Sequence, residues 1–227
     1  MSERSCSMNL FGFNKPQIYT PVKTLIFQSP KKFEQAIKGY TEVSPFPQYS
    51  IHNAVASAEA KYTKNANTCA ILAMSNGKRT YLGHYAPEYK SSKFKSQLEH
   101  DVKKMQDETG ELSAIITGGM DKDITNGTGG LLSSQVKDSY TQLAEIGEVL
   151  DKANANLTMI SAKILPSFKE HLAVTPDKFI ITHSPNSINS KIPKLLSYPN
   201  TNEFEKELNN YYSIVEIDPA HKIYYEG

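Results

Sequence analysis

Apolar and polar positions alternate or repeat along most of this chain in patterns that predict short strands and amphipathic helices. Apolar residues recur at helical spacing over 92–106 and again over 134–153, each time after a serine that can act as the N-cap. A shorter helix is predicted to follow Ser29-Pro30. Runs rich in β-branched and other apolar residues predict strands at 24–27, 69–75, 78–85, 112–117, 157–165, 179–182, 212–217 and 222–225.

The order of these elements predicts an α/β (α+β) domain with mixed, largely antiparallel β-sheets in a sandwich-like core flanked by helices. The last two strands are predicted to form a terminal hairpin. A short helix is expected at 202–211. The two prolines of 41–49 indicate a linker, so residues 1–45 are expected to form an extension that packs on a main domain of 46–227.

The strongest turn signal is Asn76-Gly77, which stands between two apolar runs. Both residues tolerate the positive φ angles of a type I′ turn. A two-residue loop there pairs Ser75 with Lys78 and, further back, Cys69 with His84. Because directly opposed residues share a face, with Cβ atoms about 4.5–5.5 Å apart, this register predicts a thiol beside an imidazole. That is the pairing a cysteine nucleophile needs.

The polar run 63–68 is predicted to be a loop that leads into Cys69. Loops often carry functional residues, and the backbone amides of Asn67 and Thr68 are candidate donors to an oxyanion. The alternative interpretation is a buried thiol facing a structural histidine. His183, at the end of the strand 179–182, is a second candidate partner for Cys69, although no turn sets its register.

Composition narrows the class of protein without naming an activity. The 227 residues include two cysteines, Cys6 and Cys69, too few for a disulfide framework or a cysteine-rich zinc site. The histidines lack metal-ligand spacing, and the Gly-rich loop 125–130 lacks a phosphate-binding spacing, so we expect no metal and no cofactor. A net charge of +1 requires neither nucleic acid nor a membrane surface, and no apolar run approaches the length of a transmembrane helix.

Between Thr63 and His84 the chain resembles the Cys-His protein glutamine deamidases, which include the chemotaxis receptor deamidase CheD, the catalytic domain of cytotoxic necrotizing factors and the Burkholderia lethal factor. In that family a threonine precedes the catalytic cysteine by six residues, as Thr63 precedes Cys69, and the catalytic histidine follows in the next strand, as His84 does. The downstream order, GHYAP, a helix, SAIITGGM, a helix and LTMISAKI, is also similar, so the resemblance covers about residues 50–165. The family has Leu-x-Gly-Cys at the nucleophile, whereas this chain has Thr68 before Cys69.

The resemblance implies a cysteine-dependent amidohydrolase that deamidates a glutamine side chain of a protein substrate through a thioester. Cys69 would be the nucleophile, His84 the general base and acid, and Thr63 the residue that orients His84. It further implies a bacterial toxin or virulence effector. We expect a monomer that is cytoplasmic or is secreted into a host cell without a cleaved signal peptide. Two alternatives stay open: a cysteine peptidase or acyltransferase with the same dyad, and a non-catalytic binding module with a buried cysteine.

Overall fold

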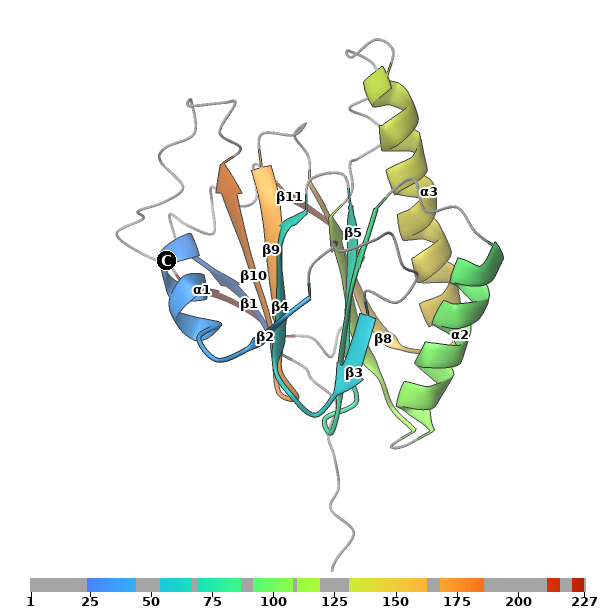
Figure 1. Ribbon diagram of the computed structural model, residues 1–227, viewed down its shortest axis with the longest axis horizontal. Helices are drawn as coiled ribbons and strands as arrows, with labels where there is room; N and C mark the ends of the chain where they lie inside the picture. Colours follow the sequence, from blue (N-terminus) through green and yellow to red (C-terminus); the bar gives the residue numbers. More distant parts are fainter. Residues whose placement is uncertain are drawn as a thin grey trace, which may run out of the picture.

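Two six-stranded sheets stack face to face, and helices cover their outer faces (Figure 1). This arrangement is seen in a computed structural model. The structure describes residues 24–43, 54–66, 69–86, 92–107, 110–118, 131–162, 168–185, 212–216 and 222–226. The predicted class, mixed and largely antiparallel sheets in a sandwich flanked by helices, is confirmed.

The strands divide between the sheets without following chain order. Sheet A contains, side by side, β12 (Lys222–Glu226), β1 (Thr24–Gln28), β10 (Phe179–Pro185), β9 (Phe168–Val174), β4 (Lys61–Ala66) and β2 (Thr41–Glu42). Sheet B contains β11 (Tyr212–Glu216), β8 (Asn156–Ala162), β7 (Ser113–Gly118), β5 (Ala70–Ser75), β6 (Thr80–Tyr85) and β3 (Ala54–Ser57). The helices are α1 (Pro30–Ala36), α2 (Ser92–Gln106) and α3 (Leu131–Lys152).

Three apolar clusters hold these layers together. The cluster between the sheets joins Leu172 and Phe179 of sheet A to Ile71 and Leu82 of sheet B. A larger cluster packs α2 and α3 on the outer face of sheet B, and a small one packs α1 on the outer face of sheet A. The strands β5, β6 and β7 of sheet B are therefore buried on both faces, and every one of their residues is buried. No helix in the described ranges has both the length and the apolar character that a membrane crossing requires.

Several predicted elements are confirmed, with ends that differ by a few residues. The first strand, the helix after Ser29-Pro30 and the two long helices are all present. The boundary expected after residue 45 stays a prediction. Within the expected extension, β1 lies between β10 and β12 in the interior of sheet A.

Three predictions about strands are wrong. The run 63–66 belongs to β4 and is not a loop, because Thr63 and Ala66 are buried between the sheets. The strand β9 is absent from the predicted elements, since Lys169, Glu170 and His171 interrupt its apolar pattern. The terminal strands form no hairpin, because β11 pairs with β8 in sheet B and β12 pairs with β1 in sheet A. The expected helix 202–211 and loop 125–130 lie outside the described residues.

The hairpin of β5 and β6 is present, but its loop has four residues and not two. Ser75 pairs with Thr80, and the Asn76 amide donates to the Arg79 carbonyl at 3.2 Å. Among these loop residues only Gly77 has a positive φ, of 80°, so the type I′ turn, which needs two, does not form. The buried Asn76 side chain accepts hydrogen bonds from the amides of Lys78 and Arg79, at 3.0 and 2.7 Å, and donates to the Met105 carbonyl at 2.8 Å. This side chain therefore fixes the wider loop.

We expect Asn76→Ala to lower the free energy of unfolding by about 2–4 kcal/mol, since it leaves several polar groups without partners. Asn76→Asp is the matched variant, because it keeps the oxygen that accepts from the loop amides but replaces the donor to Met105 by an acceptor oxygen that faces the same carbonyl. Urea unfolding should place the Asn76→Asp variant between wild type and the Asn76→Ala variant. Equal losses for the two variants would contradict the assignment of the loop to the Asn76 oxygen.

Candidate active site

Cys69 and His84 lie on the same face of sheet B, but not in the predicted register. His84 faces Ile71, and Cys69 stands two residues before Ile71, so the predicted direct pair is wrong. The shift is an even number of residues, which preserves the face. Diagonal neighbours of this kind have Cα atoms about 7–8 Å apart, within reach of a ring side chain. Cys69 directly precedes β5 and packs against the cluster between the sheets, to which Ile71 belongs.

Thr63 approaches His84 from the opposite sheet. Its hydroxyl oxygen lies 2.7 Å from Nδ1 of His84, and both side chains are buried. A bulge between Thr63 and Ala66, where Asn65 has a φ of 64°, lets both residues face the interior despite their odd spacing. Asparagine adopts this left-handed conformation more readily than most residues, so the local sequence favours the bulge. The hydroxyl of Thr63, and not its carbonyl, makes the contact.

Burial sets the state of the histidine. It lowers the pKa of His84 to about 4, so the imidazole is neutral at neutral pH. Its Nε2 is buried and has no hydrogen-bond partner among the described residues. In the tautomer with hydrogen on Nδ1, that hydrogen is donated to the Thr63 oxygen and Nε2 keeps a free lone pair. The side of the ring away from Thr63 can therefore accept a proton, and Cys69, which is only partly buried, lies on the same face.

Sequence reasoning missed Glu170, an acidic residue that the fold brings to the same region. It lies on β9, opposite Ala66, and is 3% exposed. The Thr117 hydroxyl donates to its Oε2 at 2.5 Å, and Thr117 faces Ile71 from the other side. Ile71 is thus flanked by His84 on β6 and Thr117 on β7. Each of these two residues forms a hydrogen bond with a residue of sheet A, His84 with Thr63 and Thr117 with Glu170.

Burial also changes the carboxyl of Glu170. It raises the pKa of Glu170 to about 7, against the lowering effect of the Thr117 hydroxyl and the Gly118 backbone amide. Its Oε1 is buried and has no hydrogen-bond partner in the described part of the chain. One sequence signal could have revealed β9, namely the turn-forming residues Thr175-Pro176-Asp177-Lys178 before the predicted strand 179–182. In the structure this run is the turn that joins β9 to β10, and the Thr175 amide donates to the Lys178 carbonyl at 2.9 Å.

A glycine fixes the backbone of Cys69 against β7. Gly118 has a φ of 85°, and a Cβ built on it would lie 2.2 Å from the carbonyl oxygen of Cys69. No side chain fits in that space, and the positive φ also favours glycine. The glycine at the end of β7 therefore allows this strand to approach the backbone of Cys69.

The other candidate residues from the sequence lie either outside the described residues or on sheet A. Asn67 and Thr68, the expected oxyanion donors, lie outside the described residues, as do Cys6, His52 and His221. His183 pairs with Glu170 in the backbone register of β10 and β9. His171 lies on the outer face of sheet A, where its ring centroid is 6.0 Å from that of Phe33. In the described ranges no group of three or more His, Cys, Asp or Glu side chains is placed to hold a metal ion.

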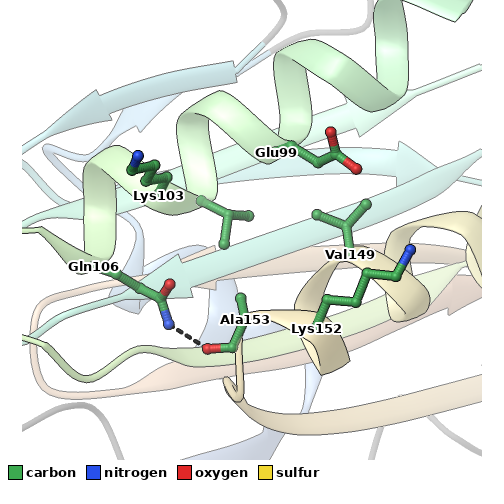
Figure 2. A pocket seen from close by; sticks show the side chains of 7 residues that line it. Glu99, Lys103, Gln106, Val149, Lys152 and Ala153 are labelled. Carbon is green, nitrogen blue, oxygen red and sulfur yellow. Dashed lines mark hydrogen bonds between the residues drawn. The ribbon is translucent and has the colours of Figure 1, made fainter.

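A hollow between α2 and α3 is separate from these residues (Figure 2). Glu99, Lys103 and Lys152 line it, and Gln106 closes one end by donating to the Ala153 carbonyl at 2.5 Å. It lies in the helical layer outside sheet B, whereas Cys69 and His84 lie on the face of that sheet that points to sheet A.

Sequence comparisons place this chain in no known group: no protein family model matches it, and no curated protein does. The function proposed below is therefore argued from the geometry of the site. The site consists of a partly buried thiol on the same face as a buried neutral imidazole, with the Thr63 hydroxyl on one ring nitrogen and a buried carboxyl bonded to the neighbouring strand β7.

We expect Gly118→Ala to destabilise the protein by more than the roughly 1–2 kcal/mol that a left-handed conformation costs a non-glycine residue. Gly110→Ala is the matched control, because Gly110 has a φ of 78° but no atom within 4 Å of an added Cβ. Urea unfolding measures both losses. A Gly118→Ala loss no larger than that of Gly110→Ala would show that the close approach to Cys69 carries no energy.

The raised pKa of Glu170 predicts a pH-dependent stability. Between its ordinary value of 4.5 and about 7, the native state holds a proton that the unfolded state has lost, so the free energy of unfolding falls as pH rises through this window. His84 acts in the opposite sense between pH 6.5 and about 4, where stability falls as pH drops. We expect Glu170→Gln to abolish the first effect and leave the second. Relative to wild type it should gain on the order of 2–3 kcal/mol between pH 5 and pH 8 in urea unfolding. A difference that stays constant with pH would contradict a buried, protonated Glu170.

Proposed function

We propose that this protein is a cysteine-dependent amidohydrolase that deamidates a glutamine side chain of a protein substrate. The observation that carries the proposal is the bond of 2.7 Å between the Thr63 hydroxyl and His84 Nδ1, which leaves Nε2 free on the face that Cys69 shares. Of the residues that resemble the Cys-His protein deamidases, Thr63 and His84 are bonded to each other, and Cys69 lies two residues before Ile71, the residue opposite His84. The same resemblance implies that the protein is a toxin or effector whose substrate belongs to a host cell.

The reaction proceeds in two halves. His84 Nε2 takes the proton of the Cys69 thiol as sulfur attacks the carboxamide carbon, which forms an S–C bond and a negatively charged oxygen. His84 then gives that proton to the carboxamide nitrogen and the C–N bond breaks. Ammonia departs, and the acyl group remains on the Cys69 sulfur as a thioester. Next, His84 takes a proton from water, whose oxygen attacks the thioester carbon. The C–S bond breaks, the sulfur recovers the proton, and the product is a glutamate side chain.

Burial determines how the first proton moves. Because the pKa of His84 is held near 4, no stable imidazolium exists before substrate arrives. Proton transfer from the thiol therefore accompanies the attack and does not precede it. Thr63 accepts the Nδ1 hydrogen, fixes the ring plane and keeps Nε2 in its unprotonated form. No step uses a metal or a cofactor.

The test compares wild type with Cys69→Ser, His84→Gln and Thr63→Val after incubation with host-cell and bacterial lysates. Wild type should release ammonia and raise the mass of particular glutamine peptides by the difference between NH₂ and OH. Cys69→Ser and His84→Gln should abolish the change, and Thr63→Val should reduce it by about 10- to 100-fold, since general acid–base catalysis typically contributes 10²–10⁴-fold. Proteomic mass spectrometry and an ammonia assay give the readouts.

Three results would contradict deamidation, and each points elsewhere. Cleaved chains that depend on Cys69 would indicate a peptidase. Acyl groups transferred to other amines would indicate an acyltransferase. Lysate proteins retained equally by wild type and Cys69→Ser, without any covalent change, would indicate a binding module in which the thiol is structural.

A further inference from the structure

Glu170 lies at the end of the inter-sheet space where Cys69 stands, and the proposed reaction does not yet use it. Its Oε2 accepts the Thr117 hydroxyl, the Gly118 backbone amide faces the same carboxyl, and Gly118 packs against the Cys69 carbonyl. Glu170 also faces Ala66, the last residue of β4, and Cys69 follows three positions later. The contacts of Thr117 and Gly118 thus connect this carboxyl to the backbone of Cys69.

The two carboxyl oxygens of Glu170 differ in their side-chain contacts. Oε1 is buried without a hydrogen-bond partner among the described residues, and His84 Nε2 is in the same condition. A buried polar atom of a native protein normally has a partner, so an exception requires an explanation. Two such atoms, His84 Nε2 on sheet B and Glu170 Oε1 on sheet A, lie on the inner faces of the two sheets, where a further polar group can bind.

We propose that Glu170, in its protonated form, is the hydrogen-bond donor to the oxyanion that forms when Cys69 attacks a carbonyl carbon. A protonated carboxyl has one O–H donor, and with Oε2 bonded to Thr117 that donor is Oε1. The proton stays on Glu170 throughout, so no covalent step is added. This inference rests on the proposed function, since it assigns the oxyanion donor of the same reaction.

The surroundings favour the protonated form. Ala66 on β4 lies opposite Glu170, Thr117 on β7 donates a hydrogen bond to it, and Cys69 directly precedes β5. On β10, His183 stands opposite Glu170 in the backbone register. His84 on β6 is neutral. A buried carboxyl among such groups keeps its proton to higher pH than an exposed one, and a neutral acid can then donate to a developing negative charge.

Two small reagents separate oxyanion stabilisation from thiol reactivity. 4-Nitrophenyl acetate acylates a thiol through a tetrahedral oxyanion, whereas iodoacetamide alkylates it by displacement of iodide without one. Cys6→Ser is placed in every variant, so that Cys69 is the only thiol of the chain. Release of 4-nitrophenol and the mass of the intact protein give both rates between pH 5.5 and 9. Their ratio is independent of the ionised fraction of the thiol.

We expect Glu170→Ala to lower the acylation rate about 100-fold, the usual effect of losing one oxyanion donor, and to leave alkylation unchanged. Glu170→Gln retains a neutral N–H donor of similar reach, so it should keep most of the acylation rate. In wild type the ratio of acylation to alkylation should fall above about pH 7, as Glu170 ionises. In Glu170→Gln it should not fall.

Other outcomes overturn the inference or the proposed function separately. Equal acylation by Glu170→Ala and wild type, or equally slow acylation by folded Glu170→Gln and Glu170→Ala, overturns the role of Glu170. Thermal unfolding establishes that each variant is folded. If lysate proteins are deamidated at the wild-type rate by Glu170→Ala, the role is wrong and deamidation stands. If Cys69 is acylated with the expected dependence on Glu170 but no protein is deamidated, the oxyanion role stands and the substrate class is wrong. A folded wild-type protein whose Cys69 reacts with neither reagent overturns both.

Discussion

The apolar contact between the two sheets is the constraint on which the rest of the structure depends. Its residues come from strands far apart in the chain, such as Leu25 and Phe179 on one side and Ile71 and Ile115 on the other. Because a strand presents alternate residues to each face, burying this set also decides which polar residues are enclosed with it. Thr63, His84, Thr117 and Glu170 are enclosed for that reason, and each finds a partner on the opposite sheet.

Enclosure gives the site its electrostatic character. The same removal from water lowers the pKa of the histidine to about 4 and raises that of the glutamate to about 7. Both side chains are therefore neutral in mildly acidic solution, and neither compensates the charge of the other. A site of neutral donors and acceptors suits a neutral carboxamide better than a charged side chain, since a charge would lose its water without gaining an ionic partner.

Much of this arrangement could be predicted from the sequence, and the features that could not be predicted depend on tertiary contacts. The face shared by Cys69 and His84 was predictable because parity along a strand survives an error of two residues in the loop. The loop length itself was not, because the Asn76 side chain that accepts from the loop amides is also held by the Met105 carbonyl on α2, a tertiary contact that the local sequence does not show. β9 was missed because Glu170 is a charged residue type on a buried face, which is unfavourable unless tertiary contacts support it. The last two strands were paired wrongly because proximity in the chain does not decide between two available sheet edges.

Cys69 occupies the point where the chain leaves one sheet and enters the other. Ala66 ends β4 in sheet A, and Ala70 begins β5 in sheet B. Cys69 directly precedes β5, and its side chain is less buried than those of His84 and Glu170, which lie within strands. In the proposed reaction Cys69 is thus the most accessible residue of the group, whereas His84, the proposed base, and Glu170, the proposed hydrogen-bond donor, are buried. That division, a partly buried thiol with fully buried partners, follows from the topology of the two sheets and would be lost if Cys69 lay two residues further along, within β5, where every side chain is buried.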